Sequence, residues 1–188
     1  MQAFLVSTGI VGLAEMGDKT QLLALVLAAR FRKPWPIALG ILAATLANHA
    51  MAGALGAWVT TFLSPQTLRW MLGASFLAMA VWMLIPDRLD NEALDKKRPR
   101  FGVFGTTVAV FFLAEMGDKT QIATVMLAAR FDAYLWVVAG TTLGMMLANA
   151  PVVWLGSRFM HLIPLRVVRV VSAGVFAGLG ALALWLPV

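Results

Sequence analysis

The nine residues LAEMGDKTQ occur twice, at positions 13–21 and 113–121, inside stretches that are otherwise apolar. Each copy carries two carboxylates and one lysine, and on the membrane insertion scale each such charge costs nominally about 2.5–3.5 kcal/mol at mid-depth. Ionisable residues at that depth pair with one another or mark an ion pathway. The doubled motif therefore predicts a functional site. The alternative is a set of Glu–Lys pairs that only fastens two halves of the protein together.

The acids of the motif, Glu15, Asp18, Glu115 and Asp118, have the chemistry of a site for a divalent cation. Carboxylate, amide and hydroxyl oxygens suit Ca²⁺, Mn²⁺ or Mg²⁺, whereas zinc and copper sites generally recruit His or Cys. The chain has no cysteine. Four carboxylates and two lysines sum to a charge that one divalent cation would neutralise. We expect a transported ion here and no cofactor.

Other polar residues are candidates for supporting roles at this site. Lys19 and Lys119 would pair with the acids, either as counter-ions that move or as fixed struts. Asn48 and Asn149 occupy matching places and would act as additional ligands or as helix–helix hydrogen bonds. His49 has no counterpart in the second half and would handle protons or make a local hydrogen bond. Neutral oxygens that add to the site or orient the acids would come from Thr20, Thr120, Gln21 and Gln121.

The elements that position these residues are predicted to be membrane helices. Hydrophobic residues make up 61% of the 188 residues and charged residues 13%, whereas soluble domains are about a quarter charged. An open strand could not satisfy its backbone in lipid, so long apolar runs indicate helices. We expect an all-α integral membrane protein with six spans, at residues 3–29, 37–61, 67–85, 102–129, 134–156 and 167–186. On a continuous first helix, Glu15, Asp18 and Lys19 would share one face.

The two halves of the chain match at an offset of 100, as in Arg30 and Arg130, Gly40 and Gly140, and Arg69 and Arg169. This predicts a first three-helix repeat at 1–86, a charged cytoplasmic linker at 87–100 and a second repeat at 101–188. Because three is odd, the second repeat would enter the membrane upside down, which gives the inverted repeat of many secondary transporters. A site made from both copies would lie near the bilayer midplane.

The distribution of Lys and Arg predicts the orientation. Eleven of them fall in the connections within 30–33, 88–100 and 158–169, and only Arg69 and Arg130 fall on the opposite side. The positive-inside rule makes the first side cytoplasmic and both termini extracytoplasmic. The net charge of +6 is therefore explained by topology, and no nucleic-acid partner is expected.

The paired E-x-G-D-K-T motifs, one in each three-helix repeat, resemble the uncharacterised protein family sixteen. That family includes the Golgi cation/proton exchangers of yeast and humans and the MneA-type bacterial manganese exporters. The resemblance implies export of Mn²⁺, or in some members Ca²⁺, in exchange for H⁺ across a bacterial inner membrane. It also implies that the motif acids at positions 15, 18, 115 and 118 are the ion ligands.

The resulting hypothesis is a Mn²⁺/H⁺ antiporter in the lipid bilayer. A Ca²⁺/H⁺ antiporter, a passive divalent cation channel and a structural membrane scaffold are the alternatives. An enzyme is not expected, because the sequence has no HExxH motif and no nucleophile elbow. Two three-helix repeats form a thin wall around a site, which is compatible with a homodimer.

Overall fold

The computed structural model describes residues 1–85, 101–156 and 165–185. The predicted linker at 87–100, the predicted break around Ile163 and the end of the last predicted span lie outside these residues. The described residues form helices and no strand, which confirms the all-α prediction. The helices are α1 (Gln2–Glu15), α2 (Lys19–Phe31), α3 (Pro34–Thr60), α4 (Pro65–Met83), α5 (Gly102–Glu115), α6 (Lys119–Arg130), α7 (Tyr134–Leu155) and α9 (Leu165–Trp185).

The prediction of continuous helices over 3–29 and 102–129 was wrong. In both copies of the motif the helix ends at the glutamate and a new helix begins at the lysine. Gly17 and Gly117 have φ angles of +83° and +73°, in the left-handed region that favours glycine. Asp18 and Asp118 follow with extended backbone and occupy the position before the new helix. The glutamate, aspartate and lysine are therefore presented by a helix break, and not by one helical face.

Three helices within the described ranges are long and apolar enough to cross a membrane: α3, α7 and residues Arg166–Trp185 of α9. The helices α1 and α5 are apolar but have 14 residues each. At 1.5 Å per residue such a helix is about 21 Å long, shorter than the roughly 30 Å hydrocarbon core. Two helices are therefore needed to cross the hydrocarbon core in each half: α1 together with α2, and α5 together with α6.

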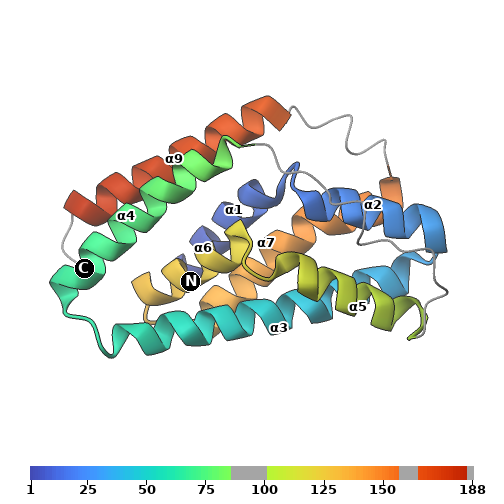
Figure 1. Cartoon of the computed structure of the whole chain (residues 1–188), viewed down its shortest axis with the longest axis horizontal. Coiled ribbons are helices and arrows are strands. Elements are labelled where there is room, and N and C mark those ends of the chain that lie inside the picture. Colours follow the sequence, from blue (N-terminus) through green and yellow to red (C-terminus); the bar gives the residue numbers. More distant parts are fainter. Residues whose placement is uncertain (86–100, 157–164, 186–188) are drawn as a thin grey trace.

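The long helices α3 and α7 contact each other, and each is covered mainly by the broken helices of the other half (Figure 1). Thus α1 and α2 pack on α7, whereas α5 and α6 pack on α3. Glycines permit the close approach at matching places. A Cβ at Gly40 would lie 2.7 Å from Thr107 Cβ, and a Cβ at Gly140 would lie 2.5 Å from the carbonyl oxygen of Phe4. The helix breaks are thereby held between α3 and α7.

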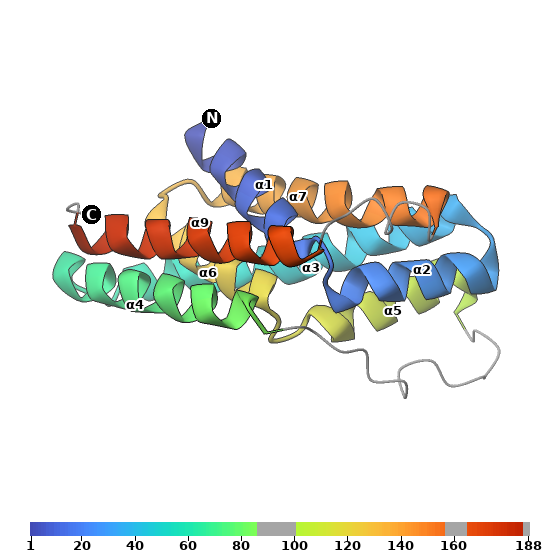
Figure 2. The ribbon, with the colours of Figure 1, turned by 90° about the horizontal axis from the view of Figure 1, so that it is seen from above.

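The remaining helices, α4 and α9, lie side by side and run in opposite directions (Figure 2). Along the length of the molecule, α1 and α6 lie in one half, the α1–α6 end, and α2 and α5 lie in the other, the α2–α5 end. The α4–α9 pair covers the α1–α6 end. Its side chains share an apolar cluster with α1 and α6 that includes Ile10, Phe76, Met126 and Phe176.

Candidate ion-binding site

The two helix breaks bring three carboxylates from both halves of the chain together. One oxygen from each of Glu15, Glu115 and Asp118 lies within 4.8 Å of the other two. All three residues are buried. Such a cluster of buried acids is expensive unless a cation or protons compensate the charge. The arrangement can hold a cation between α1, α5 and the residue before α6.

Hydroxyl and amide donors orient the two glutamates in equivalent ways. Thr20 Oγ1 donates to Glu15 Oε2 at 2.6 Å, and Thr120 Oγ1 donates to Glu115 Oε2 at 2.9 Å. Asn149 Nδ2 also donates to Glu15 Oε2, at 3.3 Å. Because each of these bonds uses the Oε2 atom, the other oxygen of each glutamate remains available to a ligand.

Several buried oxygens at the site accept no hydrogen bond from the described part of the chain. They are Glu15 Oε1, Glu115 Oε1, Asp118 Oδ2 and Asn149 Oδ1. A buried acceptor without a donor is costly, and coordination of a cation would compensate that cost. Carboxylate and amide oxygens are the ligand types of Mg²⁺, Ca²⁺ and Mn²⁺.

The glutamines of the motif hold the helix breaks in shape. Gln21 Oε1 accepts from the backbone N–H of Gly17 at 2.8 Å, and Gln121 Oε1 accepts from that of Gly117 at 2.7 Å. Gln21 Nε2 then donates to the carbonyl of Ala148 in α7 at 2.9 Å. Each glutamine thus closes the loop of its own break, and Gln21 also ties its break to the long helix behind it.

Lys19 forms an ion pair with the other half of the chain. Its Nζ lies 2.7 Å from Asp118 Oδ1, and no Glu15–Lys19 pair of the kind suggested by their spacing is observed among the described residues. Lys119 is buried and its Nζ lies 5.9 Å from the centre of the Trp82 ring in α4. Lys119 is thus more deeply buried than Lys19, although the two motifs are identical.

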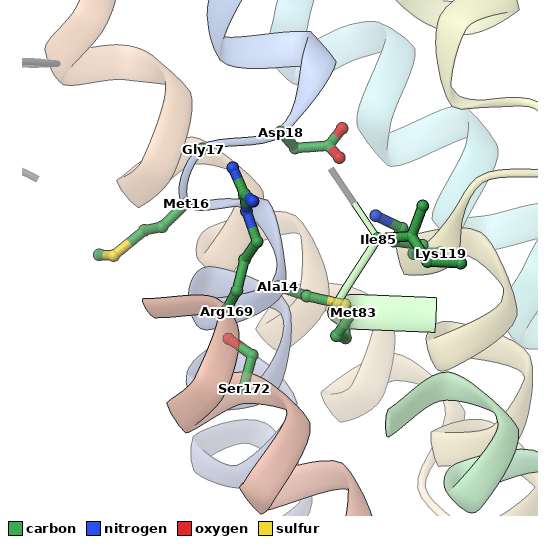
Figure 3. Close-up of a pocket in the computed structure, with 9 residues that line it drawn as sticks. All are labelled: Ala14, Met16, Gly17, Asp18, Met83, Ile85, Lys119, Arg169 and Ser172. Atoms are coloured by element: carbon green, nitrogen blue, oxygen red, sulfur yellow. The ribbon is translucent and has the colours of Figure 1, made fainter. Parts of the chain in front are cut away.

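Asp18 lies outside the three-carboxylate cluster and lines a small pocket of about 10 Å³ (Figure 3). Lys119 lines the same pocket from α6, and Arg169 extends from α9 toward the break at Gly17. Met83 and Ser172 complete the wall from α4 and α9. The pocket has room for about one water molecule, so it forms a narrow polar approach to the motif.

Asn48 and His49, both buried in α3, are placed near the site in different ways. Asn48 Nδ2 donates to the carbonyl of Phe112 in α5 at 3.0 Å, and its Oδ1 accepts from Gln121 Nε2 at 3.5 Å. Asn48 thus makes helix–helix hydrogen bonds, whereas Asn149 reaches a carboxylate. Neither ring nitrogen of His49 has a hydrogen-bond partner in the described ranges, so the expected local hydrogen bond is not found there.

Sequence reasoning missed Arg169 and Ser172, which line the pocket, and Trp82, whose ring faces Lys119. Arg169 had been treated only as one of many basic residues near a membrane face. Its match with Arg69 at the repeat offset was the one available signal that it had a specific place. No motif in the sequence distinguished Trp82 or Ser172 from other residues of apolar helices.

Comparison with known proteins identifies the family. The model of a family described as "Divalent cation/proton antiporter GDT1" matches residues 3–91 and 103–187, so each matched stretch contains one copy of the motif. The chain belongs to the GDT1 family. This confirms the resemblance inferred from the doubled motif and makes the chain a member of a family of membrane transporters.

Three relatives show how similar the chain is to known proteins. A Vibrio cholerae protein named "Putative manganese exporter" is 53% identical over 177 residues, which cover 94% of this chain and 87% of that protein. The Synechocystis GDT1-like protein sll0615 is 30% identical over 77% of this chain and 78% of its own length. The Saccharomyces cerevisiae divalent cation/proton antiporter GDT1 is 24% identical over 94% of this chain and 81% of its own length. No solved structure matches the chain.

Proposed function

We propose that this protein exports Mn²⁺ from a bacterial cytoplasm in exchange for protons, with the ion bound by Glu15, Glu115 and Asp118. One observation carries the proposal: buried carboxylate oxygens from both motif copies converge within 4.8 Å, and several of them accept no hydrogen bond from the described residues. Asp18, on the pocket beside this cluster, would bind the ion as it enters or leaves. The name of the Vibrio cholerae relative supports manganese as the cargo.

The proposed architecture is a pair of inverted repeats that together span the membrane six times. Its support is the direction of the helices: α1, α3 and α4 each run opposite to their counterparts α5, α7 and α9 (Figures 1 and 2). The breaks in both motif helices resemble the discontinuous helices that form ion sites at the midplane of many transporters. Arg30 lies in the last turn of α2, and Arg32 and Lys33 directly follow that helix. These charges favour a cytoplasmic position for the α2–α5 end and extracytoplasmic termini.

Coupling to protons follows from the ligands. Carboxylates must lose their protons to bind a metal ion, so binding of Mn²⁺ releases protons and binding of protons releases Mn²⁺. Asn149, Thr20 and Thr120 donate to the Oε2 atoms of the glutamates. They therefore stay in place in both the protonated and the Mn²⁺-bound site. Lys19 would neutralise Asp118 in the empty site during the return step.

Reconstituted proteoliposomes test the proposal. An inward Mn²⁺ gradient should drive proton movement in the opposite direction, and Glu15→Gln and Asp118→Asn should abolish both fluxes. Asp132→Asn is the matched control, because Asp132 is an exposed acid away from the site. Full transport by Glu15→Gln or Asp118→Asn would refute the site. Preferential competition by Ca²⁺ would favour a calcium exchanger, and Mn²⁺ flux without proton movement would favour a channel.

A further inference from the structure

The position of the α4–α9 pair breaks the correspondence between the two halves of the chain. The other helices contact one another in equivalent ways: α1 with α7 as α5 with α3, and α2 with α7 as α6 with α3. The α4–α9 pair does not follow this rule. Helix α9 packs on α1 and α4 packs on α6, whereas the equivalent pairs, α4 with α5 and α9 with α2, make no comparable contact in the described part of the chain (Figures 1 and 2).

Side chains at equivalent positions of α6 and α2 differ in burial, because the α4–α9 pair covers α6 rather than α2. On α6, Met126 is 4% exposed and belongs to the apolar cluster that the pair shares with α1 and α6. Its counterpart on α2, Val26, is only partly buried. An apolar surface on α2 thus matches the one that the pair covers on α6, so the pair has an equivalent place available at the α2–α5 end.

The contact between the pair and the α1–α6 end is loosely packed on one side. A cavity of about 220 Å³ is lined by Phe76 and Leu182 of the pair and by Val6 and Leu127 of the helices beneath it. Side chains that face a void lack contacts on that side. Separating these surfaces therefore breaks fewer contacts than separating a close-packed core would.

One hydrogen bond ties the pair to α1 at the helix break. Ser172 Oγ donates to the carbonyl of Leu13 at 3.1 Å, in the last turn of α1, where carbonyls lack helical donors. At the equivalent positions stand Leu72 and Leu113. Because the side chain of Leu72 cannot donate a hydrogen bond, a bond of this kind exists in only one of the two possible positions of the pair.

A second asymmetry concerns the equivalent arginines Arg69 and Arg169. The guanidinium of Arg69 in α4 donates to the carbonyl of Leu184 in the last turn of α9. The counterpart of that carbonyl belongs to Leu84. No hydrogen bond joins Arg169 to Leu84 in the part of the chain that is described. Arg169 instead lines the pocket beside Asp18.

We propose that the α4–α9 pair is the moving element of transport and that Arg69 and Arg169 alternately bind the ends of the pair. This inference rests on the proposed antiporter function and specifies its conformational step. In the observed state Arg69 binds Leu184, the pair covers the α1–α6 end, and the pocket approaches the motif from the other side. In the opposite state the pair covers α2 and α5, Arg169 binds the Leu84 carbonyl, and Arg69 is released.

The absence of cysteine from the chain permits a direct test with the single variant Met16→Cys, whose side chain lines the pocket. Small methanethiosulfonate reagents that do not cross the membrane would be added to each face separately. We expect modification from the face at the α2–α5 end. Adding Arg69→Gln should lower the rate of modification from that face roughly ten- to a hundredfold, the value of one hydrogen bond from a charged group. Adding Arg169→Gln should leave the rate equal or higher.

Opposite responses to equivalent substitutions separate this proposal from a general loss of stability, which would change both variants alike. Cationic and anionic reagents of equal size must give the same ratio, because a purely local charge effect at Arg169 would reverse between them. Ser172→Ala, which removes only the tie to α1, should act in the direction of Arg69→Gln and remains informative if the arginine variant does not fold. Equal responses of the arginine variants, or none, would overturn the proposal. The labelling needs no Mn²⁺, so a failure of manganese transport would refute the proposed function without affecting this result.

Discussion

Lys19 of the first motif pairs with Asp118 of the second, with Nζ and Oδ1 2.7 Å apart. The pair crosses between the two halves of the chain and ends on a carboxylate of the three-acid cluster. One positive charge therefore stands where a bound cation would have to compete with it. Lys19 of the first motif thus serves a carboxylate of the second copy.

Replacing this lysine should separate binding from transport. Lys19→Gln removes the charge that competes with the cation, so Mn²⁺ should bind roughly tenfold more tightly, as expected from about 1.4 kcal/mol of Coulomb energy. Without Lys19 the charge of Asp118 is not neutralised in the empty site, so the return step of the transport cycle should slow and turnover should fall. Isothermal titration and proteoliposome flux measure the two effects. Lys33→Gln, at an exposed lysine, is the control, and weaker Mn²⁺ binding by Lys19→Gln would contradict the proposed role of Lys19.

The hydroxyl of Thr20 should matter for the ion more than an ordinary buried threonine. Thr20→Val preserves shape but removes the 2.6 Å hydrogen bond to Glu15, and bonds to charged groups are worth about 1.5–3 kcal/mol. Affinity for Mn²⁺ should fall by about tenfold or more. Thr124→Val provides the matched control, since Thr124 is equally buried but donates to the Thr120 carbonyl. If both variants bind Mn²⁺ equally well, the hydroxyl of Thr20 does not position Glu15 for the ion.

Much of this arrangement was predictable from the sequence because it depends on spacing and repetition. Two identical acidic motifs in apolar segments predicted that Glu15 and Glu115 would lie together, and the structure places them together. The helix break was missed because apolar composition dominates the segment. Its signals were present nonetheless: Gly17 ends a helix through its positive φ, and Asp18 is a favoured residue before a helix start.

The difference between Asp18 and Asp118 could not have been predicted from the motifs, because the two copies have the same residues. Asp118 belongs to the carboxylate cluster, whereas Asp18 lies outside it and lines the pocket. This asymmetry is associated with the position of the α4–α9 pair, whose helices differ more in sequence than the motifs do. The sequence predicts two equivalent acids, whereas the structure places only Asp118 in the cluster with Glu15 and Glu115.

Binding of Mn²⁺ should depend steeply on pH. Because the ion displaces protons from the carboxylates, a lower pH supplies a competitor and weakens the affinity, by up to about tenfold per pH unit for each proton released. Titration calorimetry in buffers of different ionisation enthalpy counts those protons. Asp118→Asn should release fewer protons and show a shallower dependence. An affinity that is the same at pH 6 and pH 8 would argue against shared proton and metal sites.

The backbone at Gly117 should be more sensitive to a methyl group than the space around it suggests. A Cβ there would meet nothing within 4 Å, but φ is +73°, and an L-residue in this region is strained by about 1–2 kcal/mol. Gly117→Ala should therefore lower the unfolding temperature in detergent and weaken Mn²⁺ binding by distorting the break between Glu115 and Asp118. Gly178→Ala in α9 is the matched control: it also meets nothing within 4 Å but lies in a regular helix, where alanine is favoured over glycine by up to about 1 kcal/mol. Its stability should be unchanged or higher. If Gly117→Ala behaves like Gly178→Ala, the left-handed break is not required to hold the site in shape.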